Sequence, residues 1–288
     1  MKNLLYLIII ALAFCQAGFG QTETEASKTQ KKEDNMTPER LVSSHLASIG
    51  STAVLASVKS RVMVGNARLT SKLGYSGQVT GPVQFASDGE KVLFAMIFNS
   101  NDYPYEKGAY DGEDITVGRP NGNRTPLGDF LKSQGVIFKE GLIGGVLSSA
   151  WSLVNLDTKK SKLEYAGTEK INDRQLHKLK YIANKGGDLK ITLYFEADTY
   201  RHVLSKYEYS IAPRLGTITT NASQKPSYYT MVEQFSDFKT ADKLTLPQGY
   251  SINVTIQTES GTNSLEWTMK FSEFYFNETL DAAVFKVS

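Results

Sequence analysis

Apolar and polar residues alternate along most of the chain, which is the pattern of β-strands with one buried face. The clearest example lies between Leu163 and Tyr209, where residues 189–195 place leucine, isoleucine and phenylalanine on one face and lysine, threonine and tyrosine on the other. Turn residues rich in glycine and aspartate flank this strand on both sides. Loops this short cannot carry a parallel crossover, so the stretch predicts an antiparallel meander of three strands.

The same alternation predicts further strands before and after this meander. The stretch 250–256 and the stretch 265–271 alternate strictly across a glycine turn and predict a hairpin. Phe274 and Phe276 continue in the opposite phase, which indicates a β-bulge. Lys91 to Phe98 is apolar in both phases, so both of its faces should be covered. Together the patterns predict an α+β protein with a single antiparallel sheet of about ten strands.

Helical patterns occur in two places. Thr37-Pro38-Glu39 is a helix start, followed by apolar residues at helical spacing and a stop at Gly50; a second short helix is expected over 53–59. Asp129 to Val154 is the most helical segment, although several glycines interrupt it, each of which costs a helix about 1 kcal/mol relative to alanine. Two interpretations stay open: a pair of core helices joined at Gly141, or a movable apolar cover.

The first residues have the features of a targeting segment. Lys2 precedes an apolar run from Leu4 to Phe14, and Gly18-Phe19-Gly20 predicts a signal peptide over residues 1–20 that is cleaved after Gly20. Lipid attachment at Cys15 is the rival interpretation, but Phe14 stands where a small residue is needed, so we expect no anchor there. Residues 21–36 are polar and predict a disordered linker, which leaves 37–288 as the folded domain.

Composition and motifs narrow the possible chemistry. The chain has 288 residues with a net charge of +2, so no basic footprint for nucleic acid is expected. The sequence contains no zinc-protease motif, paired cysteines, phosphate-binding loop or nucleophile elbow, and three histidines are scattered, so we expect no metal, no cofactor and no enzyme. The acidic cluster of Asp111, Glu113 and Asp114 could serve acid–base chemistry or calcium, but a hydrated turn is the expectation.

The second half of the chain resembles the LolA/LolB-like superfamily of periplasmic lipoprotein carriers. The stretches that carry the resemblance are Gly167 to Ile171, Leu193 to Thr199, Phe235 to Lys239 with Leu244 to Pro247, and Phe274 to Asn277 with Leu280, Asp281 and Phe285. The resemblance implies a strongly curved, unclosed β-barrel covered by helices, with an apolar concave face. No position of the sequence matches the arginine that locks the helical lid in these carriers.

The resemblance also implies a function. Members carry lipids or the acyl chains of lipoproteins through the periplasm, so we expect a monomeric periplasmic carrier that serves outer-membrane lipoprotein sorting and meets envelope transport machinery. The alternative is a non-catalytic interaction or structural protein of the cell envelope with the same fold and a filled cavity. Under the carrier hypothesis the residues expected to contact the ligand are Phe94, Met96, Phe98, Phe138, Leu142, Val146, Ile191, Leu193, Phe195, Ile252, Val254, Trp267 and Met269.

Overall fold

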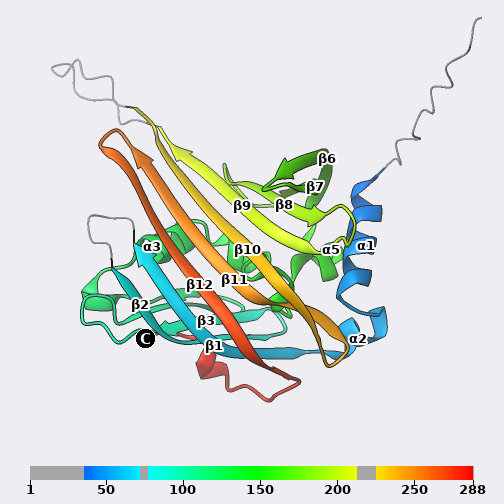
Figure 1. The fold of residues 1–288 in the computed structure, drawn as a ribbon, viewed down its shortest axis with the longest axis horizontal. Helices are drawn as coiled ribbons and strands as arrows, with labels where there is room; N and C mark the ends of the chain where they lie inside the picture. Colours follow the sequence, from blue (N-terminus) through cyan, green and yellow to red (C-terminus); the bar gives the residue numbers. More distant parts are fainter. Residues whose placement is uncertain (1–35, 72–76, 213–224, 288) are drawn as a thin grey trace, which may run out of the picture. The chain divides into compact units, whose positions relative to one another are not determined.

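The apolar alternation is realised as one antiparallel sheet (Figure 1). The computed structural model describes residues 36–71, 77–212 and 225–287. The predicted signal peptide, Cys15 and all of the predicted linker except Met36 lie outside this part of the chain. The strands are β1 (Ser60–Ser71), β2 (Gln78–Asp88), β3 (Lys91–Ile97), β4 (Tyr105–Tyr110), β5 (Ile115–Val117), β6 (Lys162–Ile171), β7 (Arg174–Ile182), β8 (Lys190–Glu196), β9 (His202–Ile211), β10 (Ser227–Ala241), β11 (Leu244–Thr258) and β12 (Gly261–Phe276).

The order of the strands in the sheet is β5-β4-β3-β2-β1-β12-β11-β10-β9-β8-β7-β6, and every neighbouring pair is antiparallel. Within the described residues β5 and β6 are the two free edges, so the sheet is not closed. The single, unclosed antiparallel sheet is therefore confirmed.

The prediction of about ten strands is wrong, because the described residues form twelve. The two strands that the sequence pattern does not predict are β4 and β6. In β4 the buried positions include a charged residue, Glu106, and a glycine, Gly108, so the strand shows no apolar face. In β6 a register shift between Tyr165 and Thr168 interrupts the alternation, with Gly167 at a φ of 81°.

The β-bulge predicted near the end of the last strand is present. Val64 of β1 pairs with Glu273 and Gly65 pairs with Phe271, so Ser272 is the extra residue of β12. Gly65 is required there, since a Cβ atom at this position would lie 2.0 Å from the carbonyl oxygen of Lys270. The bulge lets Phe274 pack against the same main core as Phe271, although the two residues are three apart in the sequence.

Helices contribute less than the sequence predicts. Helix α1 (Pro38–Ile49) starts at Thr37, whose side chain accepts a hydrogen bond from the backbone nitrogen of Arg40. The other helical pieces are short: α2 (Thr52–Ser57), α3 (Pro126–Ser133), α4 (Val136–Lys139), α5 (Leu156–Lys159), η1 (Pro120–Gly122), η2 (Gly145–Leu147), η3 (Ser152–Val154) and η4 (Ala282–Phe285). No helix in the described ranges has the length and apolarity needed to cross a bilayer.

The prediction of a long helical segment from Asp129 to Val154 is wrong. Only α3, α4 and two short 3-10 turns form there. Gly141, Gly144 and Gly145 have φ values of 70°, 73° and 48°, in the left-handed region that ends a helix. Residues 126–154, called the cover segment below, are therefore a chain of tight turns rather than a pair of helices.

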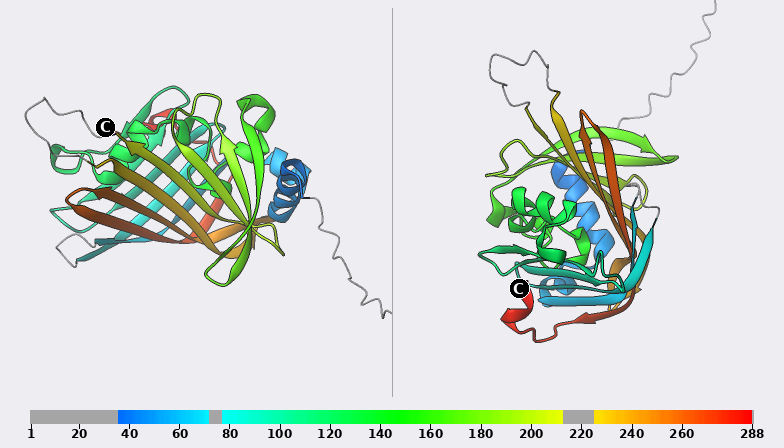
Figure 2. Two further views of the ribbon diagram at one scale, coloured as in Figure 1. Left: turned by 90° about the horizontal axis from the view of Figure 1, so that it is seen from above. Right: turned by 90° about the vertical axis from the view of Figure 1, so that its left-hand side faces the viewer.

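The two faces of the sheet are buried differently. The concave face carries the main core, and the cover segment and α1 lie on that side (Figure 2). On the convex face of β1 to β4, a smaller cluster forms around Phe285 of η4, with Val62, Ala86 and Leu93. The prediction that both faces of Lys91 to Phe98 are covered is confirmed, because Phe94 joins the main core and Leu93 the smaller cluster.

Candidate functional site: a covered concave face and an apolar groove

The structure brings all of the predicted ligand-contacting residues into one buried cluster. Ten of them come from the sheet or the residue that follows β3, and three, Phe138, Leu142 and Val146, come from the cover segment. None of them is more than 4% exposed. Phe138 stacks on Phe94 with ring centroids 6.3 Å apart. The cover segment thus occupies the space on the concave face in which a ligand would lie.

Polar groups of the sheet hold the cover segment by its backbone. Glu233 of β10 accepts a hydrogen bond from the nitrogen of Gly144 at 2.8 Å. Arg61 of β1 donates from Nη1 to the carbonyl oxygen of Val146 at 2.5 Å. Ser87 of β2 accepts from the nitrogen of Ser149 at 2.8 Å. These contacts fix a glycine-rich turn that has little regular structure of its own, and no residue had been predicted to make them.

Glu233 is fully buried, and its surroundings suit a neutral carboxyl group. Burial raises its pKa to about 7, although hydrogen bonds from Tyr250, Tyr207 and the Gly144 nitrogen oppose the shift. The hydroxyl of Tyr207 lies 2.7 Å from Oε2 of Glu233 and 3.3 Å from the carbonyl oxygen of Leu142. When Glu233 is protonated, Tyr207 can accept from it and donate to Leu142. When Glu233 is ionised, Tyr207 donates to the carboxylate instead.

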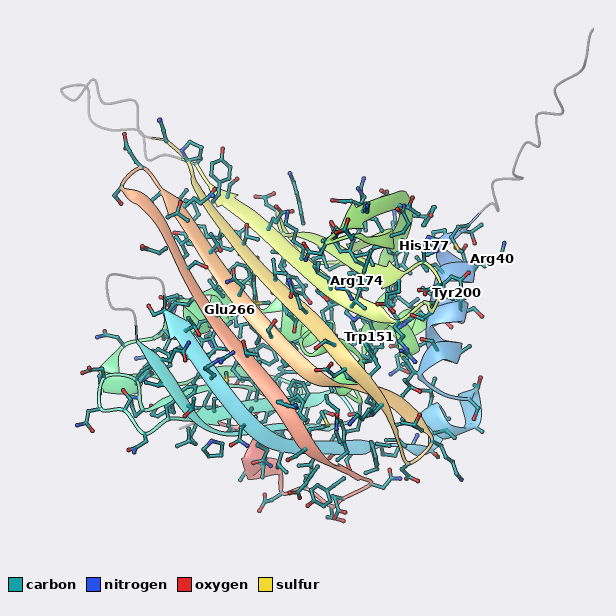
Figure 3. All side chains as sticks on the ribbon, viewed as in Figure 1. Arg40, Trp151, Arg174, His177, Tyr200 and Glu266 are labelled. Carbon is teal, nitrogen blue, oxygen red and sulfur yellow. The ribbon has the colours of Figure 1, made fainter. Side chains whose placement is uncertain are left out.

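A second polar cluster joins α1 to the end of the cover segment. Trp151 donates from Nε1 to Nε2 of His45 at 3.0 Å, and the other ring nitrogen of His45 bonds the carbonyl oxygen of Tyr200 at 3.0 Å. Figure 3 labels Trp151 and Tyr200, the two residues that His45 joins. His45 is therefore a neutral imidazole, and burial lowers its pKa to about 4. His202 stacks on Trp151 at 4.9 Å. Histidines that are far apart in the sequence thus meet here, but in the described residues they join no metal-binding group.

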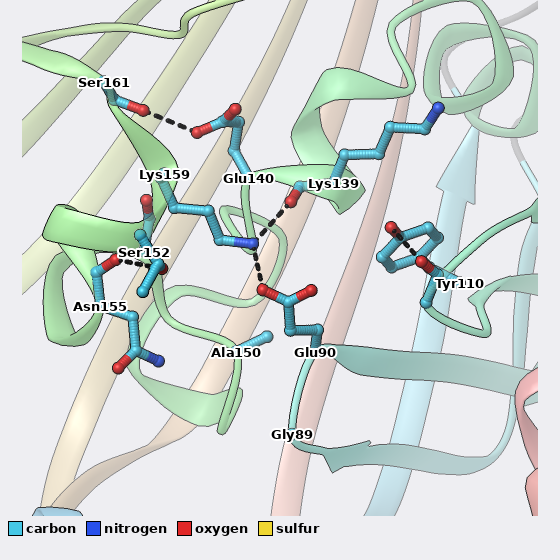
Figure 4. Close-up of polar contacts among 12 residues, drawn as sticks. Gly89, Glu90, Tyr110, Lys139, Glu140, Ala150, Ser152, Asn155, Lys159 and Ser161 are labelled. Atoms are coloured by element: carbon cyan, nitrogen blue, oxygen red, sulfur yellow. Dashed lines mark hydrogen bonds and ion pairs between the residues drawn. The ribbon is translucent and has the colours of Figure 1, made fainter.

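A third network lies where the cover segment meets α5. The hydroxyl of Tyr181 donates to Glu140 at 2.6 Å and contacts the hydroxyls of Ser152 and Ser161 at 2.5 and 2.7 Å. Lys159 bridges the carboxylate of Glu90 and the carbonyl oxygen of Lys139, as Figure 4 shows. This network ties the cover segment to both halves of the sheet at one end.

An open groove of about 1500 Å³ lies at this end of the sheet. Helices α1 and α2 form one wall, and the end of the cover segment, α5 and the β2–β3 turn form the other. The apolar lining residues are Val42, Leu46, Ala47, Leu55, Ala56, Val58, Val154, Leu156 and Leu163. Charged side chains of both signs surround them: Glu39, Lys59, Glu90, Asp157 and Lys160. The groove is thus amphipathic and larger than the 300–1,000 Å³ typical of a small-molecule pocket.

Neither the groove nor the buried charges Arg61 and Glu233 are predicted from the sequence. The groove depends on how α1 and α2 sit against α5, which no local pattern reveals. The sequence does contain a sign of Arg61 and Glu233, because each is in phase with the apolar residues on the inward face of its strand. Arg61 is in phase with Met63, and Glu233 is in phase with Met231 and Phe235. A charged residue in an apolar phase is a reason to look for a polar site.

The acidic cluster on the loop before β5 is a turn, as expected. Oδ1 of Asp111 accepts hydrogen bonds from the nitrogens of Glu113 and Asp114 at 2.9 and 2.7 Å. These bonds lower the pKa of Asp111 to about 2 and leave its other oxygen to Lys286. The cluster is therefore explained by local structure.

No family model matches the sequence, and no curated protein matches it. Among solved structures, the chain is similar to a LolA superfamily protein from Nitrosomonas europaea, with a TM-score of 0.45 and 13% identity over 88% of this chain and 98% of that one. It is also similar to a domain from Vibrio parahaemolyticus described as lipoprotein-sorting, with a TM-score of 0.42 and 12% identity over 84% and 92% of the two chains.

A DUF1329 family protein from Desulfovibrio piger is a third such structure, with a TM-score of 0.41 and 9% identity over 86% and 96% of the two chains. The first of these three structures is described as a LolA superfamily protein, which is the superfamily that the sequence resembles. Similarity at this distance leaves the function to be argued from the chain's own residues.

Proposed function

We propose that the protein binds the acyl chain of a lipid or lipoprotein at the amphipathic groove and acts as an exported, periplasmic carrier. The observation that carries this proposal is the groove itself, which offers half-buried leucines and the half-buried Val154 to solvent at the end of an otherwise filled half-barrel. A charged rim around an apolar floor matches an amphiphile, whose chain needs burial and whose head group needs water or a partner.

Burial of the chain supplies enough free energy without any catalytic group. Each buried methylene contributes about 0.8 kcal/mol, so ten contribute about 8 kcal/mol before the costs of association. Such binding is reversible, as a carrier requires. In this proposal the cover segment can enlarge the site: its displacement would expose the ten predicted contact residues on the sheet side of the concave face to a longer chain or a second one.

A second function has its own supporting observation. The predicted contact residues of the concave face are at most 4% exposed under the cover segment, which is the arrangement expected of an envelope protein that keeps its cavity filled and binds a partner elsewhere. In that case the groove would receive no lipid, and the cover segment would stay in place.

The two functions are separated by a binding experiment with groove variants. Native mass spectrometry of the gently purified protein should show a bound lipid, and Leu46→Gln with Leu55→Gln should remove it, because both half-buried side chains line the groove. Ile256→Gln is the matched control, since Ile256 is an aliphatic residue equally half-buried but outside the groove. Protein that arrives without lipid and binds none when lipid is added would favour the filled-cavity function.

A further inference from the structure

Arg61 is a buried cation without a counter-ion. Its side chain points from β1 into the concave face, and the residue is 3% exposed. Nη1 donates to the carbonyl oxygen of Val146, while Nε has no hydrogen-bond partner. Across the described ranges no carboxylate forms an ion pair with it. Burial, with no opposing charge, lowers its pKa to about 10, at which the guanidinium stays charged at neutral pH.

A buried guanidinium with no counter-ion and an unpartnered N–H costs folding free energy unless another group supplies a negative charge and an acceptor. A buried charge is normally compensated by an ion pair, and a buried N–H without an acceptor loses the hydrogen bond that it had in water. A backbone carbonyl satisfies one donor of Arg61 but brings no negative charge. The guanidinium presents a planar fork of donors whose natural partner is a group with two oxygens in one plane, such as a carboxylate.

Arg61 also lies next to the groove. It pairs across the strands with Ser87, whose hydroxyl holds the nitrogen of Ser149, and Ser149 forms part of the groove wall. The turn 146–149 of the cover segment therefore contacts Arg61 at its first residue and lines the groove at its last. This turn follows Gly144 and Gly145, whose left-handed conformations are accessible to glycine at little cost, so the backbone can rearrange there.

We propose that Arg61 is the internal counter-ion for the carboxylate head of an acyl ligand whose chain lies in the groove. This proposal rests on the proposed function and specifies its ligand as a long-chain carboxylic acid. In the unloaded protein the carbonyl oxygen of Val146 takes the place of one carboxylate oxygen. On loading, the turn 146–149 moves aside and the carboxylate bonds Nη1 and Nε together, which satisfies both the charge and the unpartnered donor.

The test compares ligands that differ only in the head group. Dissociation constants of palmitate, methyl palmitate and hexadecyl phosphate are measured for the full chain by displacement of a fluorescent fatty-acid probe. We expect palmitate to bind about tenfold or more tightly than its methyl ester, because the ester brings no charge to Arg61.

Arg61→Met should reduce this ratio to about one while leaving the affinity for the ester unchanged. The variant should fold, because an apolar side chain of similar length replaces an unpaired buried charge. Arg61→Lys keeps the charge and loses the fork, so its ratio should lie between the two. Intact tryptophan emission in each variant confirms that the fold is retained.

Lys59→Met with Lys160→Met is the control for the alternative place of the head group, since both lysines stand at the rim of the groove. The rim variant should keep the preference for palmitate. The proposal is overturned if the rim variant loses the preference for palmitate or if Arg61→Met keeps it. It is also overturned if the wild type binds acid and ester equally, or binds hexadecyl phosphate more tightly than palmitate. In each of these cases the proposed function still stands. Failure of all three ligands to bind would overturn both.

Discussion

Glu233 should make the folded protein less stable as the pH rises from 5 to 8. Its pKa rises from 4.5 to about 7 on folding because the carboxyl group is buried under the cover segment. The folded state therefore holds a proton that the unfolded state has released. The stabilising contribution is complete below pH 4.5 and is lost as the pH rises through 7.

The magnitude follows from the shift in pKa. A difference of about 2.5 units corresponds to about 3 kcal/mol, most of it lost between pH 5 and pH 8. Glu233→Gln should remove this dependence, because the amide imitates the protonated carboxyl. Its oxygen can accept from the Gly144 nitrogen and from Tyr250, and its nitrogen can donate to Tyr207. At pH 5 the two proteins should have similar stability, and at pH 8 the variant should be the more stable by about 2–3 kcal/mol.

Urea unfolding followed by tryptophan emission at pH 5, 6, 7 and 8 measures the effect, on the assumption of two-state behaviour. Other titrating groups act equally in both proteins, so the difference between the two curves isolates Glu233. Glu259→Gln, at an exposed turn, is the control for the loss of one negative charge. A constant difference between wild type and Glu233→Gln over this pH range would refute the reasoning, as would a variant that is less stable than wild type at pH 8.

Two further predictions concern the backbone of the cover segment and the face of β12. Gly144→Ala should destabilise the fold by about 2 kcal/mol or more, because φ is positive and the added Cβ would lie 2.3 Å from the ring of Phe85. Gly77→Ala is the control, because its Cβ would meet no atom within 4 Å, and it should change stability by less than about 0.5 kcal/mol in the same urea titration. Equal effects of the two substitutions would show that the turn is not formed as described. In Trp151→Phe, the emission of the remaining Trp267 should be blue-shifted, since this indole is fully buried; an emission like that of free tryptophan in water would contradict its place on the inward face.

Period-two alternation was sufficient to predict most of the sheet, because each strand has one buried face. The meander around residues 189–195, the hairpin of β11 and β12 and the bulge at Ser272 all follow from it. The alternation did not predict β4, where contacts with other parts of the fold bury a charged residue. Glu106 is buried in β4 because Thr125 and Tyr103 satisfy its carboxylate, and neither partner is adjacent to it in the sequence.

The candidate site could be predicted from the sequence less completely than the fold. Both interpretations of residues 129–154 treated the segment as helical, and the spacing of its apolar residues could not show that left-handed glycines break the helix. The candidate ligand contacts are inward-facing apolar residues, and such residues have the same sequence pattern in a filled cavity as in an open one. The groove depends on the placing of α1 and α2 against α5, and Arg61 could have been suspected only from its phase with Met63.

Hydrogen exchange of the cover segment tests the central claim most directly. Amide protection is compared between residues 142–152 and the strands β10 and β11, in the free protein and in the presence of palmitate. If a ligand enters as proposed, the amides of residues 142–152 should exchange about tenfold or more faster on loading, since the hydrogen bonds of Gly144 to Glu233 and Ser149 to Ser87 are released, while the strands keep their protection. Protection of residues 142–152 that equals that of the strands, with and without palmitate, would contradict the account and leave the cover segment as permanent core.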